Sequence, residues 1–185
     1  EKSRTNELIV KYSFNDSLSF ENTFYRSFIE DALLYNGSYK GGSGYTNNKS
    51  DLKQDGIESN IVFKNNKQKL SIYNTISSSK DTDGSPQLNR PDSTYGMNYS
   101  RELKNNIIGP FNLNYSYKHY GKSFDFKPTE TKVDSTDIMN LSLSKETNFG
   151  LLSINITNLL DEQYQRPEGY GQNGRQLRFG FKTLF

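Results

Sequence analysis

The feature that most constrains this chain is an alternation of apolar and polar residues with a period of two, which recurs almost from end to end. A period of two indicates β-strands, because successive side chains of a strand point to opposite faces. No segment shows the 3.6-residue stripe of an amphipathic helix. The pattern therefore predicts an all-β fold of nine strands, at residues 5–14, 17–35, 55–64, 67–78, 93–104, 110–121, 135–146, 149–158 and 174–185.

The composition indicates an ordered protein although the chain is polar. Hydrophobic residues make up 32% of the chain and the mean hydropathy is −0.86, values that by themselves permit disorder. Aromatic residues, however, reach 14%, whereas disordered chains are poor in them. No apolar run approaches the roughly 18 residues of a membrane-spanning helix. We therefore expect a folded β-protein.

Missing residue types exclude several kinds of chemistry. The chain has no Cys and a single His, so disulfides, thiolate nucleophiles and zinc ribbons are excluded. A Ser-His-Asp triad would have to use His119, which has no evident partner in the sequence. Lys and Arg number 23 against 21 Asp and Glu, so no basic footprint marks a nucleic-acid partner. We expect no enzyme activity, no cofactor, no metal site and no nucleic-acid binding.

The connections between the predicted strands alternate in length. Short turns lie at 15–16, 65–66, 105–109 and 147–148, and they alternate with long segments at 36–54, 79–92, 122–134 and 159–173. Short periplasmic turns and long extracellular loops are the layout of outer-membrane barrels. A soluble sandwich also alternates apolar and polar residues, but it has no physical reason to sort its connections by end. The sequence therefore predicts an antiparallel transmembrane β-barrel.

The number of strands bears on whether this barrel is complete. Bacterial single-chain barrels close with an even number of strands, whereas nine is odd. If the last strand ends on the short-turn side, counting back places residue 1 on the long-loop side, where a complete barrel would not begin. We therefore expect residues 1–185 to be the C-terminal part of a larger barrel. Two alternatives stay open: a small self-contained passive barrel, porin-like or structural, with eight strands, and an outer-membrane enzyme.

The most specific motif lies near the C-terminus. It runs Asn158-Leu159-Leu160-Asp161-Glu162-Gln163-Tyr164, then Gly169-Tyr170, Gly174-Arg175 and a terminal Phe185. This order resembles the C-terminus of TonB-dependent outer-membrane receptors. The segments 1–3, 53–58 and 88–91 resemble strand starts and a loop-to-strand return of the same family. Within the family, the spacing along all 185 residues is most similar to the cobalamin receptors.

The resemblance implies a plugged transporter. The barrel would have 22 strands and an N-terminal plug domain that closes it, an architecture known for outer-membrane transporters. Residues 1–185 would then be the last nine strands, and the plug with its TonB-contacting segment would lie outside this chain. The implied function is active uptake of a scarce, bulky nutrient, either a cobalamin-like corrinoid or a ferric siderophore. The implied partners are the TonB complex, outer-membrane lipid, the barrel assembly machinery and the nutrient, with the C-terminus facing the periplasm.

The motif residues have structural roles in this interpretation. Asn158 and Asp161 can bond to nearby backbone groups where the strand runs into its loop. Gly174 allows a backbone conformation closed to other residues, and Arg175 pairs with Asp161 or Glu162. Leu159 and Tyr164 complete the same motif. The alternating aromatics of the last strand resemble the signal that the assembly machinery reads: Phe179, Phe181 and Phe185.

Candidate ligand-binding residues lie in the long loops. By resemblance, Asn89 and Arg90 lie near the ligand of a cobalamin receptor. Tyr39 and Tyr170 are further candidates, because aromatic and Arg side chains dominate recognition hot spots. The segment 169–174 matches G-x-G-x-x-G, but a dinucleotide site needs a strand before it and a helix after it. The segment 81–84 has the acidic residues of a calcium loop without the bidentate Glu.

Overall fold

The computed structural model describes residues 1–36, 44–47, 51–81, 84–88, 90–125, 131–166 and 169–183. For residues 33–36, 44–47, 81 and 131 it describes the backbone alone. Three predicted site residues, Tyr39, Asn89 and Phe185, lie outside the described residues. In the part of the chain that is described, no helix is long and apolar enough to cross a membrane.

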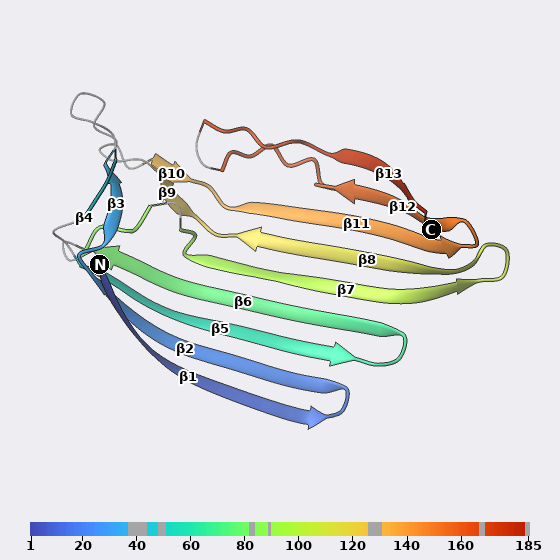
Figure 1. Ribbon diagram of the computed structural model, residues 1–185, viewed down its shortest axis with the longest axis horizontal. Helices are drawn as coiled ribbons and strands as arrows, with labels where there is room; N and C mark the ends of the chain where they lie inside the picture. Colours follow the sequence, from blue (N-terminus) through green and yellow to red (C-terminus); the bar gives the residue numbers. More distant parts are fainter. Residues whose placement is uncertain are drawn as a thin grey trace.

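All nine predicted strands are confirmed, and they form one antiparallel sheet (Figure 1). Each strand pairs with the next one along this order. The strands are β1 (Lys2–Asn15), β2 (Leu18–Glu30), β5 (Leu52–Lys64), β6 (Gln68–Asp81), β7 (Ser93–Asn105), β8 (Gly109–Tyr120), β11 (Thr136–Thr147), β12 (Gly150–Thr157) and β13 (Gln176–Lys182). Figure 1 shows the short turns together at one end of the strands, the short-turn end, and the long connections at the other, the long-loop end.

Two small hairpins in the long connections were not predicted. One pairs β3 (Leu33–Asn36) with β4 (Gly44–Asn47), and the other pairs β9 (Ser123–Asp125) with β10 (Thr131–Val133). The predicted strand 17–35 therefore divides in two. The division falls at Asp31, whose φ of 51° lies in the left-handed region and ends the extended conformation.

An Asn side chain closes three of the four short turns. The Asn15 Oδ1 accepts hydrogen bonds from the backbone N–H groups of Ser17 at 2.8 Å and Leu18 at 2.9 Å. Asn65 and Asn105 make the same pair of bonds to the second and third residues after them. Such Asx turns satisfy backbone donors that leave the ladder. The fourth turn uses Thr147, whose Oγ1 donates to the Gly150 carbonyl at 2.8 Å.

Strand register places most apolar residues of the nine strands on one face of the sheet, here called the apolar face. Residues opposite each other in an antiparallel pair share a face. One row of the apolar face joins Leu8, Phe24, Ile57 and Ile76. At the C-terminal side, a row joins Leu143, Ile154 and Phe179.

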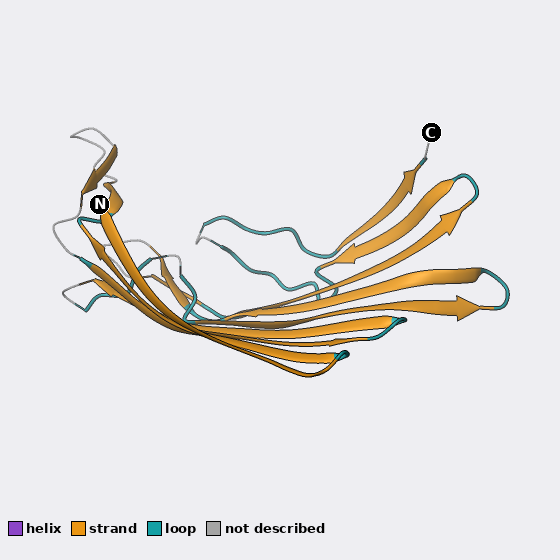
Figure 2. Ribbon diagram, turned by 60° about the horizontal axis from the view of Figure 1, so that its bottom comes forward, coloured by secondary structure: helices purple, strands orange, loops and turns teal. Residues whose placement is uncertain are grey.

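No second layer covers the apolar face. Figure 2 shows a single curved sheet. Among the described residues, Ala32 and Leu52 are the only buried apolar side chains. Phe179 is 74% exposed and Leu8 62% exposed. A soluble domain would bury such a face against another element, so this sheet needs an apolar surrounding.

The other side, here called the polar face, lines the hollow of the sheet. Tyr120 belongs to this face, because it lies opposite Thr94 and Thr136 in the register. The β12–β13 connection packs over Tyr120 through Arg166. Figure 2 shows this connection inside the concave side. The polar face is therefore concave and the apolar face convex, as in the wall of a barrel.

Two glycines of the polar face lie beneath tyrosine rings. A Cβ on Gly56 would collide with the ring of Tyr25, and one on Gly96 would collide with the Tyr117 carbonyl oxygen and, at 2.5 Å, with the Tyr73 hydroxyl. These glycines are needed for the close approach of neighbouring strands, because neither has a positive φ. The tyrosines in turn cover backbone that a glycine leaves bare.

We predict that Gly96→Ala destabilises the sheet by about 1 to 3 kcal/mol, because the methyl group meets backbone and cannot be accommodated by a side-chain rotation. Gly171→Ala is the matched control. It lies in the β12–β13 connection without a positive φ, and a Cβ added there would have no atom within 4 Å. Urea unfolding of the full-length protein in detergent, followed by heat-modifiable gel mobility, measures both. Equal midpoints for the two variants would contradict the close-packing argument.

Candidate ligand-facing surface: the concave wall and its loop rim

Hydrogen-bonded amide and hydroxyl groups cover the middle of the polar face. The bonds join neighbouring strands: Ser71 to Asn60 at 3.0 Å, Asn140 to Ser116 at 3.0 Å and Ser142 to Asn155 at 2.7 Å. A shallow hollow over strands β6 to β12 is lined by Asn98, Asn114, Ser116, Asn140, Ser142 and Asn155. This surface offers mainly neutral donors and acceptors to water or a polar solute, and Lys69 of β6 adds a positive charge to the lining. In the described residues, no group of three or more His, Cys, Asp or Glu side chains could hold a metal ion.

The predicted residue Arg90 lies at the long-loop end over the polar face. Its Nη1 donates to the Gln54 Oε1 at 3.2 Å, and the Gln54 Nε2 donates to the Tyr25 hydroxyl oxygen at 3.4 Å. Gln54 and Tyr25 both belong to the polar face by register. Arg90 remains exposed. Its role in binding a ligand stays a prediction.

Asn158 anchors the start of the β12–β13 connection. It is 5% exposed and has a φ of 51°, a conformation that Asn tolerates better than most residues. Its Nδ2 donates to the carbonyl oxygens of Glu162 at 2.9 Å and Asn173 at 3.2 Å, and its Oδ1 accepts from the Glu162 N–H at 2.9 Å. One side chain therefore joins both ends of the connection. Its own N–H donates to the Asn140 Oδ1 of the wall at 3.0 Å.

Asp161 makes the second anchor, and it corrects two details of the sequence analysis. The Asp161 Oδ1 accepts from the backbone N–H of Arg175 at 2.6 Å, so the two residues are joined by the backbone and not by the predicted ion pair. Gly174 has no positive φ, and the predicted reason for this glycine is wrong. A Cβ on Gly174 would lie 2.7 Å from the Asp161 Oδ1. Glycine is needed because the carboxylate passes close to the backbone.

The other motif residues contribute through their backbone. The Leu159 N–H donates to the Met139 carbonyl at 2.7 Å, and the Tyr164 carbonyl accepts from the Gln172 N–H at 3.0 Å. Tyr170 is 67% exposed, and its carbonyl accepts from the Arg166 N–H at 3.3 Å. No contact joins Tyr170 to Arg90 within the described residues, so the structure does not gather the predicted ligand residues at one point.

Arg166, which sequence reasoning missed, joins the β12–β13 connection to both ends of the connection between β8 and β11. Its Nη2 donates to the carbonyl oxygens of Gly121 at 2.7 Å and Asp134 at 3.3 Å, and its Cζ lies 5.0 Å from the Tyr120 ring centre. Burial lowers the pKa of the Arg166 guanidinium. Its Nε is buried without a hydrogen-bond partner among the described residues. An isolated Arg before Pro167 carries no sequence signal for this role.

His119 has a partner that the sequence did not reveal. Its Nδ1 lies 2.9 Å from the Asp137 Oδ1, and its ring stacks on Tyr95 with centroids 4.4 Å apart. The Tyr117 hydroxyl donates to the same carboxylate oxygen at 2.6 Å. The cluster lies on the apolar face, outside the hollow. Register brings these residues together across three strands, which the sequence alone does not give.

The predicted assembly-signal residues Phe179 and Phe181 lie on the apolar face of β13. They stand opposite Ile154 and Leu152 of β12 and are 74% and 58% exposed. Both rings are thus accessible on the last strand of the sheet, and their role as a signal stays a prediction.

We predict that Asn158→Ala frees the β12–β13 connection. Loss of the side-chain bonds and the strain of Ala at positive φ should lower the free energy of local opening by about 3 kcal/mol. Asn158→Gly loses the same bonds without the strain, so its effect should be smaller by about 1 kcal/mol. Hydrogen exchange at the Glu162 amide measures both. Asn173→Ala is the control, because it retains the carbonyl that Asn158 uses, and exchange as fast as in Asn158→Ala would argue against the anchor.

Comparisons with known proteins identify the architecture. No protein-family model and no curated protein matches the chain. Solved structures match 96% of it: the ferripyoverdine receptor of Pseudomonas aeruginosa (TM-score 0.75, 16% identity), the ferric yersiniabactin receptor FyuA of Yersinia pestis (0.74, 13%) and the FrpB iron transporter of Neisseria meningitidis (0.70, 11%). The chain spans only 26%, 28% and 30% of those chains, respectively. It therefore has the fold of part of the β-barrel wall of an outer-membrane iron-uptake receptor.

Proposed function

We propose that this chain is the C-terminal part of the wall of a plugged outer-membrane receptor that actively takes up a ferric siderophore. The observation that carries the proposal is the nine-stranded sheet with an uncovered apolar convex face and a hydrogen-bonded polar concave face. The first face suits lipid and the second suits a wet or plugged lumen. On β1, β2, β5 and β6 the apolar rows extend about 20 Å along the strands. For strands tilted by about 40° this is roughly 15 Å along the membrane normal, which fits within the roughly 25 Å apolar band of outer-membrane barrels.

The open edges of the sheet favour a larger barrel over the small passive one. The strand order runs from β1 to β13 without pairing these two strands to each other. Two unpaired edges in a membrane would leave backbone groups without partners, at a cost of several kcal/mol for each group. Further strands of the same wall would satisfy them. A plug domain and its contact with the TonB complex belong to the same proposal, as does recognition of β13 by the barrel assembly machinery.

The similar structures favour a siderophore over cobalamin as the substrate. Those proteins are described as receptors for ferripyoverdine, ferric yersiniabactin and ferric catecholates. The cobalamin interpretation of the sequence receives no specific support from them. The polar concave wall with Arg90 at its mouth suits an anionic, oxygen-rich iron chelate, because guanidinium groups bind carboxylates and similar oxygens in pairs.

The test is energy-dependent uptake by the full-length protein. Iron-starved cells that express it should accumulate a radioactive ferric siderophore, and a protonophore should abolish accumulation, because an active receptor depends on inner-membrane energy. A panel of ferric siderophores and cobalamin separates the substrates. Uptake that continues unchanged with the protonophore would support the passive barrel instead.

We predict that Arg90→Gln weakens binding of the ferric siderophore by about tenfold, the effect of losing about 1.4 kcal/mol of charged hydrogen bonding. Arg101→Gln is the matched control, because Arg101 lies on the apolar face near the short-turn end. Binding of the radioactive ferric siderophore to the purified full-length protein gives both dissociation constants. The same loss in the two variants would remove Arg90 from the binding surface.

A further inference from the structure

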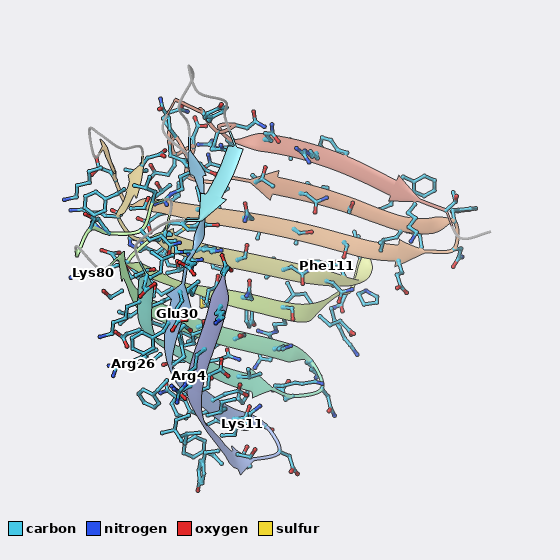
Figure 3. All side chains as sticks on the ribbon, turned by 60° about the vertical axis from the view of Figure 1, so that its left-hand side comes forward. Arg4, Lys11, Arg26, Glu30, Lys80 and Phe111 are labelled. Atoms are coloured by element: carbon cyan, nitrogen blue, oxygen red, sulfur yellow. The ribbon has the colours of Figure 1, made fainter. Side chains whose placement is uncertain are left out.

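The first four strands of the sheet carry basic side chains on their convex side, above the apolar rows. Register places Arg4, Phe28, Lys53 and Lys80 in one row across β1, β2, β5 and β6. The rows on either side add Arg26 and Lys2. We call these five cations the basic rim: Lys2, Arg4, Arg26, Lys53 and Lys80. Figure 3 shows Arg4, Arg26 and Lys80 gathered at the long-loop end, whereas Phe111 lies at the opposite end.

The same strands sort their charges by face. The polar face of β1, β2 and β5 carries Glu7, Glu21 and Glu58. Its basic residues are Lys11, which pairs with Glu21 at 3.0 Å, and Lys64 at the short-turn end. The convex face at the long-loop end carries five cations and two carboxylates. An outward position in a barrel wall normally holds an apolar residue. The basic rim departs from this rule in one region of the wall, and most of the charged residues there are positive.

The two carboxylates leave most of this positive charge uncompensated. The Asp55 Oδ1 forms an ion pair with the Arg26 Nε, and the Asp55 Oδ2 lies 3.5 Å from the Lys53 Nζ. Glu30 stands opposite Lys2 in the register. Within the described residues, no acidic side chain forms an ion pair with Arg4 or Lys80, and both are exposed. Arg26 and Lys53 also keep 58% and 50% of their side chains exposed.

The height of the basic rim matches the outer surface of a membrane. Arg4 lies about twelve residues from the short turn, which is roughly 40 Å along the strand. For strands tilted by about 40°, this is roughly 30 Å along the membrane normal, just above an apolar band of about 25 Å. Basic side chains at that level can extend toward headgroups while their stems contact hydrocarbon.

A surface depression lies where the apolar rows meet the basic rim. Its lining joins Leu8, Phe24 and Ile57 to the charged side chains of Arg26 and Asp55. An apolar floor beside cations is complementary to an amphiphile that has acyl chains and an anionic head. A siderophore in the hollow of the sheet would not reach this depression, because the depression opens on the opposite, convex face.

We propose that the basic rim binds the phosphate groups of an anionic glycolipid in the outer leaflet. Phosphates accept charge-assisted hydrogen bonds from Arg and Lys, and basic residues near an anionic membrane surface each add to the attraction. The acyl chains of the lipid lie against the apolar rows below. The inference rests on the placement of the wall in the outer membrane proposed above, and it adds a lipid site that faces away from the nutrient.

The experiment compares two triple variants of the full-length receptor in phosphatidylcholine nanodiscs that contain bisphosphorylated lipid A. Arg4→Gln/Lys53→Gln/Lys80→Gln removes three charges of the basic rim. Lys64→Gln/Lys67→Gln/Lys69→Gln removes three charges of the same sign around the β5–β6 short turn. Mass spectrometry counts the lipid A that stays bound after exchange into detergent. Lipid A without phosphates and free inorganic phosphate serve as the second ligand and the competitor.

We expect the rim variant to lose lipid A affinity by at least about tenfold, while the short-turn variant and the conservative Arg4→Lys/Lys53→Arg/Lys80→Arg variant retain it. Dephosphorylated lipid A should bind the unaltered receptor as weakly as the rim variant binds the phosphorylated form. Equal retention by both Gln variants, or loss in the charge-conserving one, would overturn the proposal. Failure of the unaltered receptor to enter nanodiscs would instead count against the membrane placement, and heat-modifiable mobility verifies that each variant is folded.

Discussion

The continuous antiparallel ladder is the interaction on which the rest of this structure depends. Each of the nine strands of the sheet is hydrogen-bonded to the next in its order, with one register shift between Ser13 and Asn15 of the β1–β2 pair, so every second residue of each strand lies on the apolar face. A slip of one residue at any pair would exchange the two faces of the following strands. In hydrocarbon no water could replace the lost backbone bonds. The ladder therefore sets at once where apolar side chains lie, which groups line the hollow and which end carries the loops.

The sequence predicts the strands well because the ladder imposes its period of two on the residues. It predicts the structure of the long connections poorly. The hairpins β3–β4 and β9–β10 lie in connections that need no alternation. Asn158 was identified, yet its bond to Asn173 spans fifteen residues. The partner of His119 is on another strand, and only the register decides which residue stands opposite. Gly174 is the clearest example of what the sequence could not predict. Glycine is required there because the Asp161 carboxylate lies close to it, and not because of the backbone φ of Gly174.

The two ends of the wall solve different physical problems. At the short-turn end, Asn15, Asn65 and Asn105 each satisfy two backbone donors with one side chain, so little chain is needed outside the ladder. At the long-loop end, Asn158 joins the two ends of the β12–β13 connection, and Arg166 joins this connection to the one between β8 and β11; the partners of both are mainly backbone carbonyls. Carbonyl partners do not depend on the identity of the residue. Other loop side chains can therefore change while these two anchors keep the β12–β13 connection in place.

Some polar and charged residues lie on the apolar face and break the alternation. They are of two kinds, which differ in whether a neighbouring side chain hydrogen-bonds to them. Within the apolar rows, Asn22 is only 9% exposed and accepts a hydrogen bond from the Ser59 hydroxyl of the next strand. A polar group facing hydrocarbon is tolerated when it is bonded in this way. Arg4 and Lys80, by contrast, have no such partner among the described residues and are exposed at the rim. An unbonded cation is stable only where water or an anion can reach it, so in the proposed membrane placement these residues lie at the level where the hydrocarbon ends.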